Sequence, residues 1–137
     1  MYKSILLAAD GSENSIRAAK ETLNFANEDT EITILNITDP ADAKNDVLHS
    51  SPAESAVHHR KEKLSDVIHI YETNGVPYKI RYEQGEPDET VVSVANNGEF
   101  QLVVLGSRGL NSLQEMVMGS VSHKVAKRAN IPVMIVK

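Results

Sequence analysis

Residues 4–12 read SILLAADGS, an almost unbroken apolar run that ends in a polar turn. An apolar run such as Ser4 to Ala9 is typical of a strand that is buried on both faces of a sheet. Ser12 can cap a following helix, and Glu13 in the first turn suits the positive end of the helix dipole. The sequence therefore predicts a central strand that passes directly into a helix.

Strand and helix patterns continue to alternate along the rest of the chain. A long helix is predicted from about Pro52 to Asn74, with Gly75 in the left-handed position past its end. Residues 78–83, YKIRYE, alternate strictly between apolar and polar side chains, which is typical of a strand at a sheet edge. The other strands are predicted at residues 31–37, 101–106 and 132–137, and the other helices from Pro87 to just before Gly98 and from Ser120 to Ala129. The apolar face of the first helix is predicted to be Ile16, Ala19, Leu23 and Ala26.

This order of elements predicts the fold class. Strands that are separated by helices run parallel and are joined by right-handed crossovers. The strand at residues 78–83, with one face toward solvent, is predicted at an edge of the sheet, whereas the apolar strands at 4–9 and 102–105 are predicted in the middle. We therefore expect one α/β domain over residues 1–137: an open, doubly wound, parallel five-stranded sheet in the order 3-2-1-4-5, with helices on both faces. Ligands of such sheets bind at the carboxyl ends of the strands, where the strand order switches.

Composition excludes several classes of function. The 137 residues include 14 Lys and Arg against 19 Asp and Glu, and the basic residues are scattered, so a nucleic-acid surface is not expected. Cysteine is absent, which excludes disulfides and thiolate metal sites. No apolar run is long enough to cross a bilayer, and the N-terminus does not resemble a signal peptide. We expect a cytoplasmic protein that is not associated with a membrane.

Three glycines and a serine near the C-terminus predict a phosphate site. At the switch point, Gly106 ends the fourth strand, and its missing Cβ would let its N–H approach an anion. Gly119 and Ser120 open a helix whose first N–H groups suit phosphate. Each glycine taken alone is better explained by a turn from strand to helix without a ligand, and the spacing is neither the dinucleotide fingerprint nor the phosphate loop of nucleotide hydrolases. Further contributions are expected from Arg108 by its charge, Gly109 by a positive φ, and Ser120 and Ser122 by their hydroxyls.

The same residues resemble a known family, the universal stress proteins. The ATP-binding members of that family carry Gly-x2-Gly-x9-Gly-Ser/Thr, and this chain matches the motif without a gap. The stretches ILLAADGSENSIRAA, GEP and ANIPVMIVK are similar to the first strand and helix, the entry to the third helix and the closing strand of the family. The resemblance covers the whole chain, and the matching motif residues are Gly106, Gly109, Gly119 and Ser120.

The resemblance implies a binding mode for ATP, with Mg²⁺, ADP and AMP as further possibilities. Asp10 would face the adenine and ribose, although a turn acid that bonds its own backbone is an equal reading of that residue from the sequence alone. Backbone groups of Ile37 would pair with the adenine edge, and Ala8 and Ala9 would line the floor. The phosphates would lie on Gly106, Arg108, Gly109, Gly119, Ser120 and Ser122, and Leu105 and Val121 complete the predicted set of contacts.

Function and assembly leave alternatives open. The chain shows neither a Lys-Ser/Thr pair nor a second acid near the glycines, so we expect a nucleotide-dependent sensor or regulator of the stress response, at most a slow ATPase. The alternative is a dimeric protein-interaction module that binds no nucleotide. A homodimer through the uncharged C-terminal strand is expected in either case. A face with His58, Glu62, Asp66 and His69 is interpreted as solvated, because these residues spread over three turns.

Overall fold

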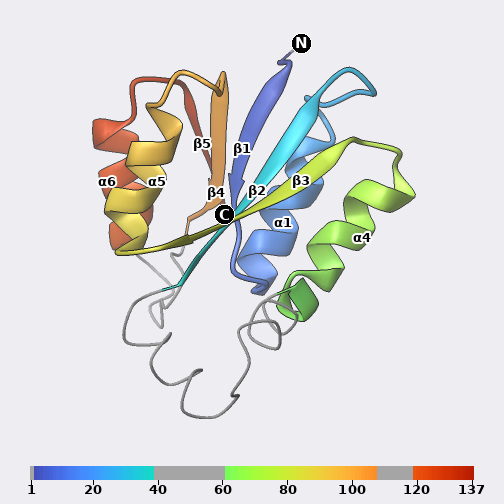
Figure 1. The fold of residues 1–137 in the computed structure, drawn as a ribbon, viewed down its shortest axis with the longest axis horizontal. Coiled ribbons are helices and arrows are strands. Elements are labelled where there is room, and N and C mark those ends of the chain that lie inside the picture. The colour runs from blue at the N-terminus through green and yellow to red at the C-terminus, as the bar shows by residue number, and fades with distance from the viewer. Residues whose placement is uncertain (1, 39–60, 108–118) are drawn as a thin grey trace.

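The computed structural model describes residues 2–38, 61–107 and 119–137 of the chain. Its sheet has five parallel strands in the order β3-β2-β1-β4-β5 (Figure 1), which confirms the predicted topology. Because all five strands run the same way, their carboxyl ends meet at one end of the molecule, the lower end in Figure 1. The strands are β1 (Ser4–Ala8), β2 (Glu31–Thr38), β3 (Tyr78–Gln84), β4 (Leu102–Gly106) and β5 (Val133–Val136).

Helices cover both faces of this sheet. One face lies under α1 (Glu13–Thr22) and α4 (Ser65–Thr73), and the other lies under α5 (Pro87–Ala95) and α6 (Ser120–Arg128), as Figure 1 shows. Alternate side chains of the central strands therefore enter two separate cores, with Ile5 and Leu7 of β1 under α1 and α4, and Leu6 and Ala8 under α5 and α6. Since both faces of β1 and β4 are buried, their apolar runs are explained.

Two details of the helices differ from the sequence prediction. The buried face of α1 consists of Ser15, Ala18, Ala19 and Thr22, and the helix ends before Leu23. Small side chains face the sheet here because α1 lies directly against the end of β4, as the contacts of Gly106 below show. In the second helix the regular part begins at Ser65, after a helical stretch at 61–63, and the predicted start near Pro52 lies outside the described residues.

Both edge strands are those that the sequence indicated. In β3 every side chain is at least partly exposed, and in β5 all four are partly buried. The predicted glycine after α4 is also confirmed, because Gly75 has a φ of +67°. No helix in the described part of the chain is long and apolar enough to cross a membrane.

Candidate nucleotide site

The carboxyl end of β1 passes into a turn that is fixed by Asp10. Its Oδ1 accepts hydrogen bonds from Ser12 N–H at 2.9 Å and from Ser15 Oγ at 2.6 Å. Ser15 Oγ in turn accepts from Asp10 N–H, and Ser12 Oγ caps α1 by accepting from Ser15 N–H. The structure thus gives Asp10 the contacts of a turn acid, one of its two readings, and these contacts hold the first turn of α1 at the strand end.

Gly11 is a structural position at the site whose contact sequence reasoning missed. It has a φ of +87°, and a Cβ at this position would collide with the backbone carbonyl of Lys63, just before α4. The turn after β1 therefore touches the beginning of the second helical segment, and only glycine fits this contact. The signal was present in the sequence as the Gly of AADGS, but a pairing with residue 63 is a long-range contact that no local pattern reveals.

At the end of β4, Gly106 serves packing. A Cβ there would lie 2.8 Å from Asn14 Cβ and 3.3 Å from Asn14 O, so the missing side chain allows α1 to approach the strand. Ser122 also has a structural contact, because its buried hydroxyl donates to the carbonyl of Gly106 at 2.7 Å. Hence the structure places the Ser122 hydroxyl toward β4, in place of the predicted contact with phosphate, and the backbone N–H of Ser122 is the group that remains for an anion.

The first turn of α6 lies beside this strand end. Gly119 was predicted to contact phosphate, and its N–H donates to Ser107 O at 2.7 Å, which closes the chain back onto the end of β4. Ser120 is exposed at the first helical position, and the N–H groups of residues 120–122 have no partner inside the helix. The first turn of α6 carries no acidic side chain, unlike those of α1, α4 and α5. Its positive end is therefore not offset by a carboxylate of its own first turn.

The hydrogen bonds between neighbouring strands show which way the backbone N–H and C=O groups point at the end of β2. Leu35 O accepts from Ala9 N–H on the β1 side, whereas Thr38 O accepts from Gly85 N–H on the β3 side. Because these directions alternate along a parallel strand, the N–H and C=O of Ile37 face the β1 side. The register pairs of β1 and β2 end at Ala8 and Leu35, so both groups of Ile37 lie beyond the last pair.

The other predicted contacts are distributed over both faces of the sheet. Ala8 and Leu105 face the core under α5 and α6, where Val121 is partly buried, while Ala9 is 1% exposed in the core under α1 and α4. Ala8 and Ala9 therefore cannot form one floor with their side chains. The predicted Arg108 and Gly109 lie outside the described residues.

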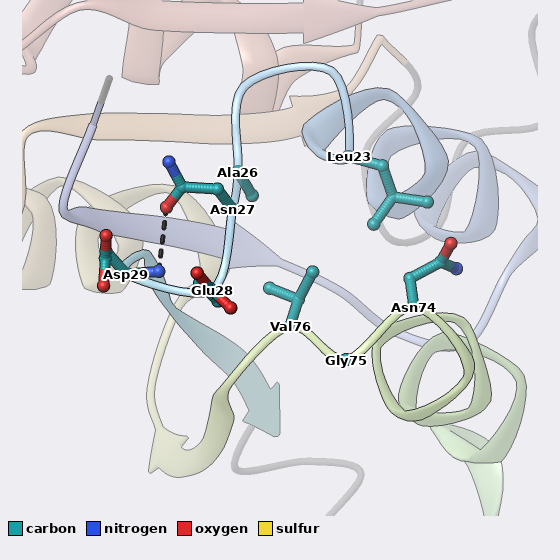
Figure 2. Close-up of a pocket in the computed structure, with 8 residues that line it drawn as sticks. All are labelled: Leu23, Ala26, Asn27, Glu28, Asp29, Asn74, Gly75 and Val76. Carbon is teal, nitrogen blue, oxygen red and sulfur yellow. Dashed lines mark hydrogen bonds between the residues drawn. The ribbon is translucent and has the colours of Figure 1, made fainter.

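A hollow of about 500 Å³ lies at the opposite end of the sheet, where β2 and β3 begin (Figure 2). Leu23 and Val76 point into it, and Glu28 lies at its rim. No Lys, Arg or His is among its lining residues, so it does not suit a phosphate group. The residues that line it are Leu23, Ala26, Asn27, Glu28, Asp29, Asn74, Gly75 and Val76.

The solvated face suggested for α4 can be followed in part. Glu62, Asp66 and His69 are exposed, and His58 lies outside the described residues. His69 Nε2 lies 3.3 Å from Thr73 Oγ1 on the next turn. Within residues 2–38, 61–107 and 119–137, no three His, Asp or Glu side chains come together in a way that could hold a metal ion.

The sequence and the fold have clear counterparts among known proteins. The model of the universal stress protein family matches residues 1–137, and this chain belongs to that family. It is 32% identical to the universal stress protein YxiE of Bacillus subtilis over 148 residues, which covers all of both chains.

Solved structures agree with this assignment. The structure of hypothetical protein MJ0577 has a TM-score of 0.82 and 29% identity, and the match covers 100% of this chain and 96% of the other; MJ0577 is a universal stress protein of Methanocaldococcus jannaschii. A universal stress protein in complex with cAMP matches with a TM-score of 0.68 at 23% identity, covering 98% of this chain and 96% of the other. An Arabidopsis thaliana family member with AMP bound has a TM-score of 0.68 at 22% identity, covering 98% and 91%. At 22–23% identity these last two show the fold alone.

Proposed function

We propose that this protein binds an adenine nucleotide, namely ATP, with ADP and AMP as further ligands, at the carboxyl ends of β1, β2 and β4. The observation that carries the proposal is the first turn of α6, which brings main-chain N–H groups to the strand switch without an acidic side chain beside them. Ligands of doubly wound sheets bind at this place. The AMP and cAMP complexes of structural neighbours support an adenine nucleotide.

The described residues fit the two ends of such a ligand. The N–H groups of residues 120–122 suit an anion, and the exposed Ser120 hydroxyl adds a donor. The N–H and C=O of Ile37, one donor and one acceptor on the same side, match the donor–acceptor edge of adenine. A Mg²⁺ ion would be held mainly by the nucleotide phosphates, because no three His, Asp or Glu side chains of the described residues come together to hold one.

A regulatory role fits this site better than rapid catalysis. Fast phosphoryl transfer needs a residue that positions water and acids that hold the metal. In the described part of the site the polar side chains of Asp10 and Ser122 hold backbone groups. The protein is therefore proposed to be a cytoplasmic nucleotide-dependent sensor of the stress response, at most a slow ATPase.

Substitution of Ser120 tests the proposal. Ser120→Asp places a carboxylate in the first turn of α6, which favours the helix by about 0.3–1 kcal/mol through its dipole. The same charge repels a phosphate, so ATP affinity should fall tenfold or more while the melting temperature holds or rises. Isothermal titration with ATP measures the affinity. Ser93→Asp, at an exposed position of α5, is the matched control and should bind ATP like the wild type. No binding of ATP, ADP or AMP to the wild-type protein, or equal binding by Ser120→Asp, would refute the proposal.

Dimerisation through β5 is the second part of the proposal. Among the strands that the structure describes, this one lies at the sheet edge and pairs with β4 alone. Its residues 133–136, VMIV, carry no charge that would discourage pairing with a second copy. The alternative function, a dimeric interaction module without nucleotide, shares this edge and is separated from a sensor by the titration.

A further inference from the structure

Asn36 is a buried amide near the end of β2, between the apolar residues Leu35 and Ile37. It is 8% exposed in β2, the strand between β3 and β1, and asparagine is disfavoured in strands. A buried polar side chain at such a place calls for an explanation in terms of its partners. Its Nδ2 donates to the carbonyl of Ala9 at 3.1 Å.

That carbonyl is the acceptor that the next rung of the sheet would use. Glu31 N–H donates to Lys3 O at the start of the pair β1·β2. The parallel ladder advances two residues on each strand per rung, so the same pattern would later join Ile37 N–H to Ala9 O. Among the described residues no such bond forms. The side chain of Asn36 occupies the acceptor in its place.

We propose that Asn36 is a positioning residue of the nucleotide site: its amide takes the Ala9 carbonyl, ends the β1·β2 ladder, and so leaves the N–H of Ile37 available for the base. The inference rests on the proposed function only for its ligand, an adenine base. The statement about the ladder concerns the free protein and can be tested without nucleotide. A carbonyl oxygen can accept two hydrogen bonds, so the bond from Asn36 alone would not exclude a second bond from Ile37 N–H. The Asn36 amide therefore acts also by occupying the space between the two strands.

A competing cause lies in β1 itself. The chain turns away after Ala9, because Asp10 N–H donates to Ser15 Oγ in the direction of α1. If this turn alone separates the strands, removal of the Asn36 amide will not bring Ile37 and Ala9 together. The two causes therefore differ in what they predict for an Asn36 variant.

Amide hydrogen exchange, followed residue by residue by NMR, decides between them. In the free wild-type protein the Ile37 N–H should exchange at least tenfold faster than the Leu35 N–H, which the ladder directs toward β1. In Asn36→Leu the Ala9 carbonyl becomes available, and protection of Ile37 should rise by tenfold or more. Asn36→Val, with a better strand former, serves if the leucine variant does not fold. Thr33→Val is the matched control, because it removes another buried polar group of β2 far from the strand end. Strong protection of Ile37 in the wild type, or unchanged protection in the folded Asn36 variant, overturns the inference.

Binding gives the second measurement. Asn36→Leu should lower the affinity for ATP about fivefold, the size expected for one hydrogen bond, while the affinity for inorganic tripolyphosphate stays within twofold of wild type. An equal ATP-to-tripolyphosphate ratio in wild type and variant overturns the role of Asn36 but leaves the proposed function standing. Absence of ATP binding in the wild type refutes the proposed function, and the exchange experiment still decides whether Asn36 ends the ladder.

Discussion

Gly106→Ala tests the packing of α1 against the end of β4. The new Cβ would lie 2.8 Å from Asn14 Cβ, closer than real Cβ contacts, and 3.3 Å from Asn14 O. Neither atom can swing away, because one is attached directly to the α1 backbone and the other belongs to it. The helix as a whole must shift, and overpacking of this kind costs about 1–3 kcal/mol. Gly106 has no positive φ, so backbone strain adds nothing to this cost.

Two favourable contributions work against the clash. Burial of one methyl group contributes roughly 0.8 kcal/mol, and alanine loses less backbone entropy than glycine in a strand, about 0.5–1 kcal/mol. The clash at 2.8 Å is close enough that we place it at the upper end of its range. The expected net loss is about 1–2 kcal/mol of unfolding free energy, and the melting temperature should fall by roughly 3–8 °C.

Urea unfolding of a double-mutant cycle identifies the cause. Asn14→Gly removes the Cβ that the new methyl meets, so Gly106→Ala should cost at least about 1 kcal/mol less in that background. Gly75→Ala is the contrasting control: a Cβ there meets nothing within 4 Å, and its cost comes from the φ of +67° alone. A Gly106→Ala protein as stable as the wild type, or an additive cycle, would show that α1 and β4 are not packed as described.

Two further variants test the α5–α6 contact and the β5 edge. Lys124 Nζ donates a hydrogen bond to Asp88 Oδ2 at 2.6 Å, and this contact lowers the pKa of Asp88. The contact therefore stabilises the folded protein at pH values above the ordinary carboxyl pKa. This stabilisation is lost as the pH falls through the lowered pKa of Asp88. Lys124→Met should return the Asp88 pKa toward its ordinary value in an NMR titration, Lys127→Met should not, and an unchanged pKa in Lys124→Met would contradict the described contact. Ile135→Pro removes an N–H that points away from β4, so sedimentation should show a monomer that keeps its fold, and a persistent dimer would exclude pairing through β5.

Topology was predictable from the sequence because it depends on patterns that local chemistry determines. The apolar runs at β1 and β4 and the alternation in β3 each reflect how many faces of a strand are buried. Pro87 at the first position of α5 and the left-handed Gly75 are likewise set by the φ that each residue permits. Each of these features lies within a single helix or strand. Together they indicated which strands are central and which are at an edge, and the predicted strand order follows from that.

The candidate site was predictable in place but not in detail. The switch point follows from topology, whereas the partner of each polar group depends on contacts between distant segments. Gly106 reads equally well as a ligand contact or as a packing position until Asn14 is known to lie against it. Ser122 is similar, because its hydroxyl reaches Gly106 O across 16 residues of sequence. Asn36 was missed because a polar residue in a β-branched run gives no sign of what it bonds.

These contacts have a common consequence for how the site works. The side chains of Asp10, Asn36 and Ser122 each bond a backbone group at the end of a strand or the start of a helix. They fix the positions of the main chain, and the described groups that we propose for the ligand are mainly backbone N–H and C=O groups, at Ile37 and in the first turn of α6. A site built from preorganised backbone groups can bind a charged ligand with little loss of conformational entropy, and backbone amides do not exchange protons with a substrate as a general acid or base does. Tight, reversible binding is therefore the behaviour that this arrangement favours, which is what a sensor of nucleotide level needs.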